Sequence, residues 1–269
     1  MYMLKRKKLG GDQSGLLDFI RGVAALLVLV AHCQQIFISP YWFPHKELDV
    51  SLALVLYRHL GSLGVMLFFA LSGFLIYQSI VNNLKSNLWS KFDLRSFFVS
   101  RLVRLYPPLL VATGVSIVAY GIIWLADVAS AVNFSTGKEI YLARNELHVN
   151  WKDIFGSLLF VNTLVEGFRS PSINGPLWSL AQEFWFYVLA AAFVSFFTSY
   201  KRIWLLVLSL TFLVLNVNEF FWYGFSVWGA GFIAAWLWSS FSFRFSQVVC
   251  LMLSISLFLF WLYALNESL

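Results

Sequence analysis

The sequence predicts an all-α fold, a polytopic integral membrane helical bundle with about seven transmembrane helices and one re-entrant or interfacial segment. The 269 residues are 60% hydrophobic and 12% charged, whereas about a quarter of the residues of a soluble domain are charged. The apolar stretches are long and continuous, unlike the alternating pattern of an outer-membrane barrel. No repeat or separate soluble domain is visible, so residues 1–269 are expected to form a single transmembrane domain.

The order of the spans follows from the apolar runs. The predicted spans are residues 16–38, 60–81, 107–126, 176–197, 203–215 and 220–238, and a last one that ends near residue 265. The run 203–215 is the shortest of these spans, and it is short for a helix that has to cross a bilayer core about 30 Å thick. The apolar piece 154–165 is too short to cross, so we interpret it as the re-entrant or interfacial segment.

The basic residues predict the orientation. Four of them, at positions 5–8, precede the first span, and five lie between residues 82 and 106 against a single acidic residue. By the positive-inside rule, residues 1–15 and 82–106 are cytoplasmic, and the loop 127–153, whose charges nearly cancel, is external. Residues 94–106 resemble an amphipathic interfacial helix that leads into the third span at Pro107.

This topology accounts for the net charge of +6, so no nucleic acid partner is expected. The expected environment is the lipid bilayer of the plasma (inner) membrane. Cys33 and Cys250 lie in apolar runs without metal-ligand spacing. We therefore expect buried thiols and no metal site.

Arg21 and His32 are the ionisable residues inside the first apolar run, together with Asp18. Eleven residues of α-helix amount to about three turns plus 20°, so Arg21 and His32 share one face, about 16 Å apart along the axis. A polar group inside the hydrocarbon core of a bilayer costs several kcal/mol unless it faces a protein interior or a watery cavity. His32 is therefore a candidate functional residue, and the alternative is a histidine hydrogen-bonded by a neighbouring helix.

Two further segments carry candidate residues. Ser72 and Gly73 in FFALSGFLIY allow either a helix backbone or a thin ligand chain to approach closely. Arg101 and Arg104 in RLVRLYPP are one helical turn apart and suit either phosphate groups or lipid headgroups.

Glu183 enters a span among aromatic residues, in GPLWSLAQEFWFY. Ser179 and Tyr187 lie four residues before and after it, so one helix face presents a hydroxyl, a carboxylate and a phenol. Trp178 and Trp185 flank this face and favour an organised site. The alternative is a carboxylate at the external end of the span that reaches water.

Four segments together resemble the acyltransferase type 3 family of membrane acyltransferases. They are LDFIRGVAALLVLVAH, FFALSGFLIY, FFVSRLVRLYPPLLVA and INGPLWSLAQEFWFY, and they follow the family's order between about residues 15 and 190. Beyond Tyr187 the chain matches only in being hydrophobic. Family members usually have more spans, so we expect a short member that lacks the last ones and acts alone, in a homo-oligomer, or as an inactive relative.

The resemblance implies an enzyme, an O-acyltransferase that takes an acyl group, usually acetyl, from cytoplasmic acyl-CoA (acetyl-CoA) to a hydroxyl of an envelope or exported carbohydrate. The residues it implies are His32, Arg21 and Glu183 for catalysis; Arg101, Arg104, Ser72 and Gly73 for the acyl-CoA; and Trp178, Ser179 and Tyr187 for the acceptor. His32 would act either as a general base or as a transiently acylated relay. The rival interpretation is a proton-coupled transporter or flippase-like permease in which Arg21, His32 and Glu183 form a proton or substrate path. The inverted repeats that would favour it are not visible.

The topology can be tested with single cysteines, introduced after Cys33 and Cys250 have been replaced. Residues 1–15, residues 82–106 and the pair Lys201 and Arg202, which follows the span 176–197, should be labelled only from the cytoplasmic side. Residues 127–153 should be labelled only from outside. Labelling of position 201 from outside would mean that residues 154–165 cross the membrane, which changes the number of spans by one.

Overall fold

Eight α-helices make up the part of the chain that the computed structural model describes, which comprises residues 8–33, 52–89, 91–126, 148–198, 202–216 and 219–268. All regular elements in these ranges are helical, which confirms the predicted all-α class. Among the predicted features, residues 1–7 of the basic N-terminus, most of the loop 127–153, and Lys201 lie outside the described residues.

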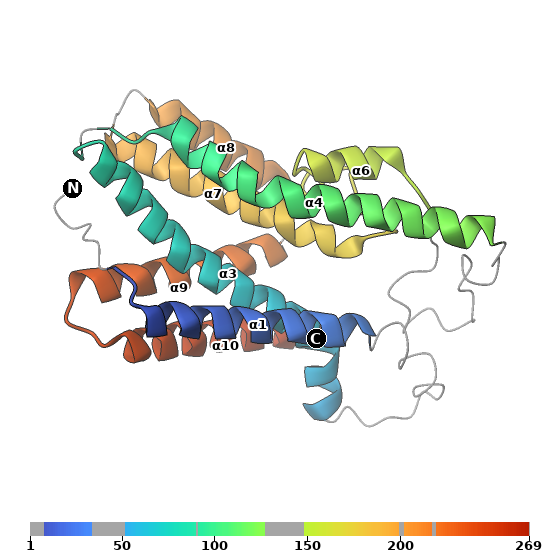
Figure 1. The fold of residues 1–269 in the computed structure, drawn as a ribbon, viewed down its shortest axis with the longest axis horizontal. Coiled ribbons are helices and arrows are strands. Elements are labelled where there is room, and N and C mark those ends of the chain that lie inside the picture. The colour runs from blue at the N-terminus through green and yellow to red at the C-terminus, as the bar shows by residue number, and fades with distance from the viewer. Residues whose placement is uncertain are drawn as a thin grey trace.

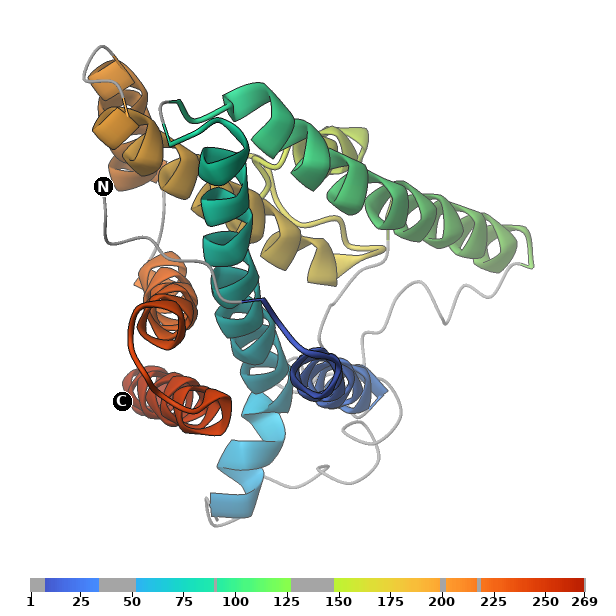
Figure 2. The same ribbon diagram turned by 60° about the vertical axis from the view of Figure 1, so that its left-hand side comes forward.

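Helix α3 is the central element of the bundle (Figures 1 and 2). The helices are α1 (Gly11–Cys33), α3 (Leu52–Ser86), α4 (Leu94–Leu125), α6 (Trp151–Leu158), α7 (Trp178–Thr198), α8 (Ile203–Asn216), α9 (Glu219–Ser240) and α10 (Phe245–Ser268). α1 packs on one side of α3 and α9 with α10 on the other, while α4, α7 and α8 lie together across the remaining side.

Within the described residues, five helices are long and apolar enough to cross a membrane: Gly11–Cys33, His59–Ser86, Leu94–Leu125, Gly175–Thr198 and Phe220–Ser240. Each overlaps a predicted span. α10 contributes a shorter apolar stretch, Phe245–Trp261. α8 has 14 residues, a length of about 21 Å, which is less than a bilayer core. The structure supports a multi-pass membrane protein, and the number of seven spans stays a prediction.

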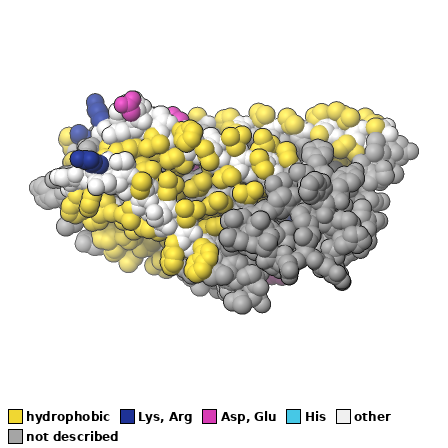
Figure 3. Space-filling view, turned by 90° about the horizontal axis from the view of Figure 1, so that it is seen from below, with side chains coloured by type: hydrophobic (Ala, Val, Ile, Leu, Met, Phe, Trp, Pro, Cys, Tyr) yellow, Lys and Arg dark blue, Asp and Glu magenta, His cyan; other side chains and the backbone are white. Residues whose placement is uncertain are grey.

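The outer surface of the bundle is apolar. Phe19, Val103 and Leu125 are 68%, 68% and 77% exposed. Hydrophobic side chains cover most of the described face in Figure 3, with Lys and Arg side chains at one end. Such a surface is compatible with lipid rather than water. It also corrects one expectation: Cys33 and Cys250 are exposed on this surface rather than buried, because an apolar run does not distinguish a lipid-facing side from a protein-facing one.

α3 and α9 cross with their backbones in close contact at two glycines. A Cβ atom on Gly73 would lie 1.9 Å from the carbonyl oxygen of Trp228, and one on Gly231 would lie 1.9 Å from that of Ala70. No real side chain fits at such distances, so glycine is required on both helices. The small pair at Ser72 and Gly73 therefore serves helix packing through its glycine.

α4 is one continuous helix, in contrast to the predicted interfacial helix 94–106 followed by a new span. Pro107 and Pro108 lie inside it rather than in a first turn. Each proline removes one backbone donor, but Leu105 and Leu109 are 5% and 1% exposed and pack into the core on either side of the pair. This packing carries the helix across the prolines.

The predicted re-entrant or interfacial segment does not cross the bundle. α6 has eight residues, and the chain then turns through Phe160 and Thr163 with positive φ. The hydroxyl of Tyr106 donates to the carbonyl of Leu158 at 2.9 Å, and Trp185 Nε1 donates to that of Phe160 at 2.9 Å. The segment is thus fixed on α4 and α7.

The C-terminal end of α3 and the starts of α4 and α8 lie at one end of the bundle (Figure 1). Arg202 Nη1, before α8, donates to the carbonyl of Phe92, before α4, at 3.1 Å. Two segments predicted to be cytoplasmic therefore meet on the same side, and their orientation in the membrane stays a prediction.

The glycine crossing predicts a sharp contrast between substitutions. Gly73→Ala and Gly231→Ala should each destabilise the protein by about 1–3 kcal/mol or more, because the new methyl group forces α3 and α9 apart. Gly229→Ala is the control on the same helix, since nothing lies within 4 Å of a Cβ at that position. Thermal unfolding in detergent measures the difference. Equal stability of all three variants would contradict the close crossing.

Candidate functional site

Glu183 is the centre of a hydrogen-bond cluster between α7 and α3. Ser72 Oγ donates to Glu183 Oε1 at 2.7 Å, and the hydroxyl of Tyr187 donates to the same oxygen. The two hydroxyl oxygens are 3.1 Å apart. Tyr187 is 2% exposed, so its hydroxyl has little freedom. Glu183 and Tyr187 share a helix face as their spacing predicts, and α3 adds the serine.

A cavity of about 320 Å³, which we call the Glu183 cavity, lies beside this cluster, between α1, α3, α4 and α7. Its polar lining consists of Arg21, Ser72, Arg104, Ser179 and Glu183. The remaining lining is apolar. Residues from all four segments that resemble the family motifs thus meet at one cavity.

The cavity carries an excess of positive charge. Arg21 and Arg104 bring two guanidinium groups, and Glu183 brings one carboxylate. Asp18 pairs with Arg21 from one turn earlier in α1, but its side chain is 62% exposed. The first turn of α7 also borders the cavity, through Ser179 and Leu180. These groups suit a ligand with negative charge.

Arg101 is not among the residues that line this cavity. Its Nη2 donates to Ser79 Oγ at 3.1 Å, and its guanidinium lies 5.9 Å from the ring centroid of Phe97. Arg101 and Arg104 are three residues apart, so they lie about 60° from each other around the helix axis and about 4.5 Å apart along it. Arg101 thus joins α4 to α3, and Arg104 reaches the cavity.

His32 and Arg21 lie on the same face of α1, as their spacing predicts. Both side chains are half-buried, on the stripe that includes the buried Ala24 and Ala31. His32 is not part of the lining of the Glu183 cavity. It lies about 16 Å further along the helix axis than Arg21, one residue before the end of α1 at Cys33. The segment that follows Cys33 is outside the described residues.

The remaining predicted residues lie around the site without a common role. Gly73 faces the backbone of α9, so that side is closed to a ligand. The Trp178 ring packs edge-on against Phe220, with centroids 5.0 Å apart. Ser179 Oγ donates to the carbonyl of Pro176 at 3.1 Å, which satisfies the serine at the start of α7.

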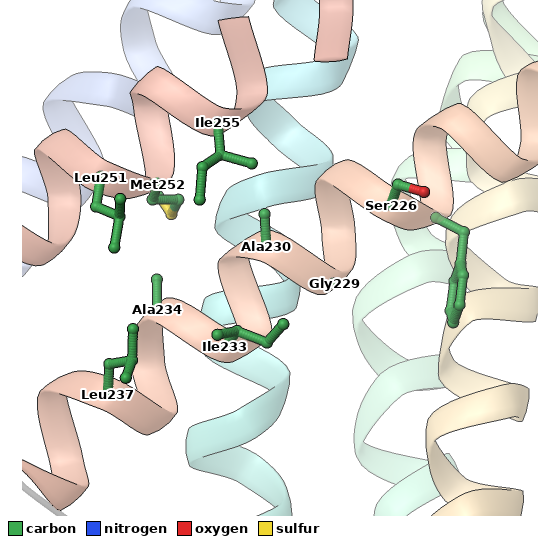
Figure 4. A pocket seen from close by; sticks show the side chains of 10 residues that line it. Ser226, Gly229, Ala230, Ile233, Ala234, Leu237, Leu251, Met252 and Ile255 are labelled. Carbon is green, nitrogen blue, oxygen red and sulfur yellow. The ribbon is translucent and has the colours of Figure 1, made fainter. Parts of the chain in front are cut away.

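A second cavity has no chemistry of its own. The groove between α9 and α10, of about 380 Å³, is lined by apolar side chains, Gly229 and Ser226 (Figure 4). Ser226 Oγ donates to the carbonyl of Trp222 in the same helix. In the described part of the chain, no group of three or more His, Cys, Asp or Glu residues could hold a metal ion.

The sequence did not reveal which polar residues pair with each other. Ser72 and Glu183 are 111 residues apart, and Arg101 and Ser79 belong to different helices. Ser79 was not a candidate. The sequence marks Ser79 only as a polar residue within an apolar helix. Many serines without an interhelical partner have the same position, so this feature alone does not identify it.

Comparison with known proteins extends the relationship over most of the chain. A family model described as an acyltransferase domain matches residues 15–268. The peptidoglycan O-acetyltransferase OatA of Listeria monocytogenes serovar 1/2a is 28% identical over 142 residues, which are 53% of this chain and 21% of that protein. The match thus spans about a fifth of that relative's length. No solved structure matches.

The family match corrects the expectation that the resemblance stops near Tyr187. It continues to residue 268, through α8, α9 and α10. The C-terminal helices therefore belong to the matched domain together with those around the Glu183 cavity. On this match, the chain belongs to the acyltransferase 3 family.

Proposed function

We propose that this protein is a membrane-bound O-acyltransferase that transfers an acyl group, acetyl in the first instance, from acyl-CoA to a hydroxyl of an envelope carbohydrate. Membership of the family supports an acyltransferase, and the distant similarity to a peptidoglycan O-acetyltransferase favours O-acetylation of a carbohydrate. The observation that carries the proposal is the Glu183 cavity, where two arginines and a carboxylate meet among otherwise apolar helices.

In this proposal, the cavity holds the acyl-CoA. Guanidinium groups bind phosphates through short, charge-assisted hydrogen bonds. Arg104 and Arg21 are therefore the proposed ligands of the phosphates of acyl-CoA. Trp178 and Ser179, at the start of α7, are the proposed contacts of the acceptor.

His32 is the proposed general base. A neutral imidazole removes the proton of the acceptor hydroxyl while its oxygen attacks the thioester carbonyl. The carbon–sulfur bond then breaks, and the proton passes to the departing thiolate. Because His32 lies about 16 Å along α1 from Arg21, the donor must extend along this helix for its thioester to reach the imidazole. Transient acylation of His32 is the alternative route.

Transfer can be measured with the purified protein in lipid nanodiscs, with radiolabelled acetyl-CoA and soluble peptidoglycan fragments as the first acceptor to try. Label in the carbohydrate supports the proposal. Transport of label or protons across proteoliposomes without transfer to any acceptor would support a permease instead.

Replacement of His32 should have the largest effect on the chemical step. His32→Ala should lower the transfer rate by about a hundredfold to ten-thousandfold, because general-base help is lost. Expression and acyl-CoA affinity should stay close to those of the unmodified protein. His148→Ala is the matched control, since that side chain is exposed outside the cavity. Transfer at a normal rate by the His32 variant would exclude the mechanism.

The two arginines of α4 should behave differently. Arg104→Gln should weaken acyl-CoA binding about tenfold to a hundredfold, because a charge-assisted hydrogen bond is worth about 1.5–3 kcal/mol. Arg101→Gln should mainly lower stability, since its partner is Ser79. Isothermal titration calorimetry with coenzyme A and thermal unfolding separate the two effects. If Arg101→Gln weakened binding as much as Arg104→Gln, the assignment of the cavity to the donor would be wrong.

A further inference from the structure

The hydrogen bonds of Glu183 use only one of its two carboxylate oxygens. Ser72 and Tyr187 both donate to Oε1. Within the ranges that the structure describes, no hydrogen bond reaches Oε2. Because Glu183 also lines the cavity, Oε2 is left as an acceptor for a bound molecule.

Ser72 and Tyr187 are held firmly by their surroundings. Tyr187 is 2% exposed, and its neighbour Phe186 packs against Phe69 of α3 with ring centroids 5.0 Å apart. Ser72 adjoins Gly73, whose position is fixed by the backbone of α9. The two hydroxyls thus come from two helices in fixed register. They set the direction of the carboxylate.

The same two hydroxyls help to keep the half-buried carboxylate in place. A charged group away from water is costly unless it is hydrogen-bonded. Two donors on Oε1 offset part of this cost, and the guanidinium groups of Arg21 and Arg104 border the same cavity. The cavity lining therefore combines the positive charge of the two arginines with one hydrogen-bond acceptor, Glu183 Oε2.

This combination fits a ligand that carries both a phosphate and an N–H donor next to apolar carbon. In acyl-CoA, the arm between the phosphates and the thioester contains two amide groups and short aliphatic segments. We propose that Ser72 and Tyr187 are positioning residues that aim Glu183 Oε2 at this arm, where it accepts a hydrogen bond from an amide N–H. The inference rests on the proposed function and assigns the amide-bearing arm to Glu183.

Binding of the arm can be distinguished from binding of the nucleotide with two ligands. Coenzyme A contains both parts, and adenosine 3′,5′-bisphosphate lacks the arm. The affinities of both should be measured by calorimetry on the full chain in nanodiscs. Glu183→Met, of similar length and a poor acceptor, should weaken coenzyme A binding about tenfold to a hundredfold. It should not weaken bisphosphate binding, because it removes a negative charge from the cavity that holds the phosphates.

The positioning role predicts a graded series. Tyr187→Phe and Ser72→Ala should each weaken coenzyme A binding about twofold to tenfold, because one donor to Oε1 is lost. Ser72→Thr keeps a hydroxyl and should restore the affinity. Tyr106→Phe is the control, since it removes the hydrogen bond of a half-buried tyrosine hydroxyl to the Leu158 carbonyl and not one to Glu183.

Each outcome has a definite meaning. Equal losses for coenzyme A and the bisphosphate in the Glu183, Tyr187 and Ser72 variants would show a general structural effect and overturn the inference. Unchanged affinity for coenzyme A in Glu183→Met would also overturn it. If the unmodified protein bound neither ligand, the proposed function itself would fail.

Discussion

The contact between α3 and α9 is the constraint on which the rest of the site depends. At Gly73 and Gly231 the two backbones approach so closely that a methyl group on either would overlap a carbonyl oxygen of the other helix. This contact fixes the rotation of α3 about its axis. Because Ser72 is the next residue, about 100° around the helix, its hydroxyl is directed away from α9, where it meets Glu183 of α7.

The same bundle has to accommodate polar groups where water is scarce. In the described residues, several of these groups bond between helices: Ser72 with Glu183, Arg101 with Ser79, and Gln78 with Ser239 at 3.3 Å. Each bond joins α3 to a different helix, α7, α4 or α9. Since unpaired polar groups in an apolar interior cost several kcal/mol, these bonds also specify how the helices are arranged around α3. Apolar packing alone would allow many arrangements.

Local patterns predicted what depends on one helix at a time. The helical class, the position of the long spans, the short α6, and the common face of Arg21 and His32 follow from length, composition and helical periodicity. The bond between Ser72 and Glu183 joins separate motifs, so no local pattern contains it. The expectation that Cys33 and Cys250 are buried was wrong because hydropathy does not distinguish a side chain that faces lipid from one that faces the protein interior. The continuity of α4 through Pro107 depends on core packing, which local rules ignore.

The separation between the cavity and His32 is set by how α1 lies on α3. A Cβ atom on Gly64 would lie 2.7 Å from the carbonyl oxygen of Ala24, and one on Gly61 would lie 3.2 Å from Cβ of Ala31. The two helices are therefore antiparallel and closely packed over the stretch between Arg21 and His32. A slip of one turn would shift the histidine by about 5.4 Å relative to the cavity. Since reacting atoms must approach to about 3–3.5 Å, the proposed transfer depends on this packing as much as on the residues that carry out the chemistry.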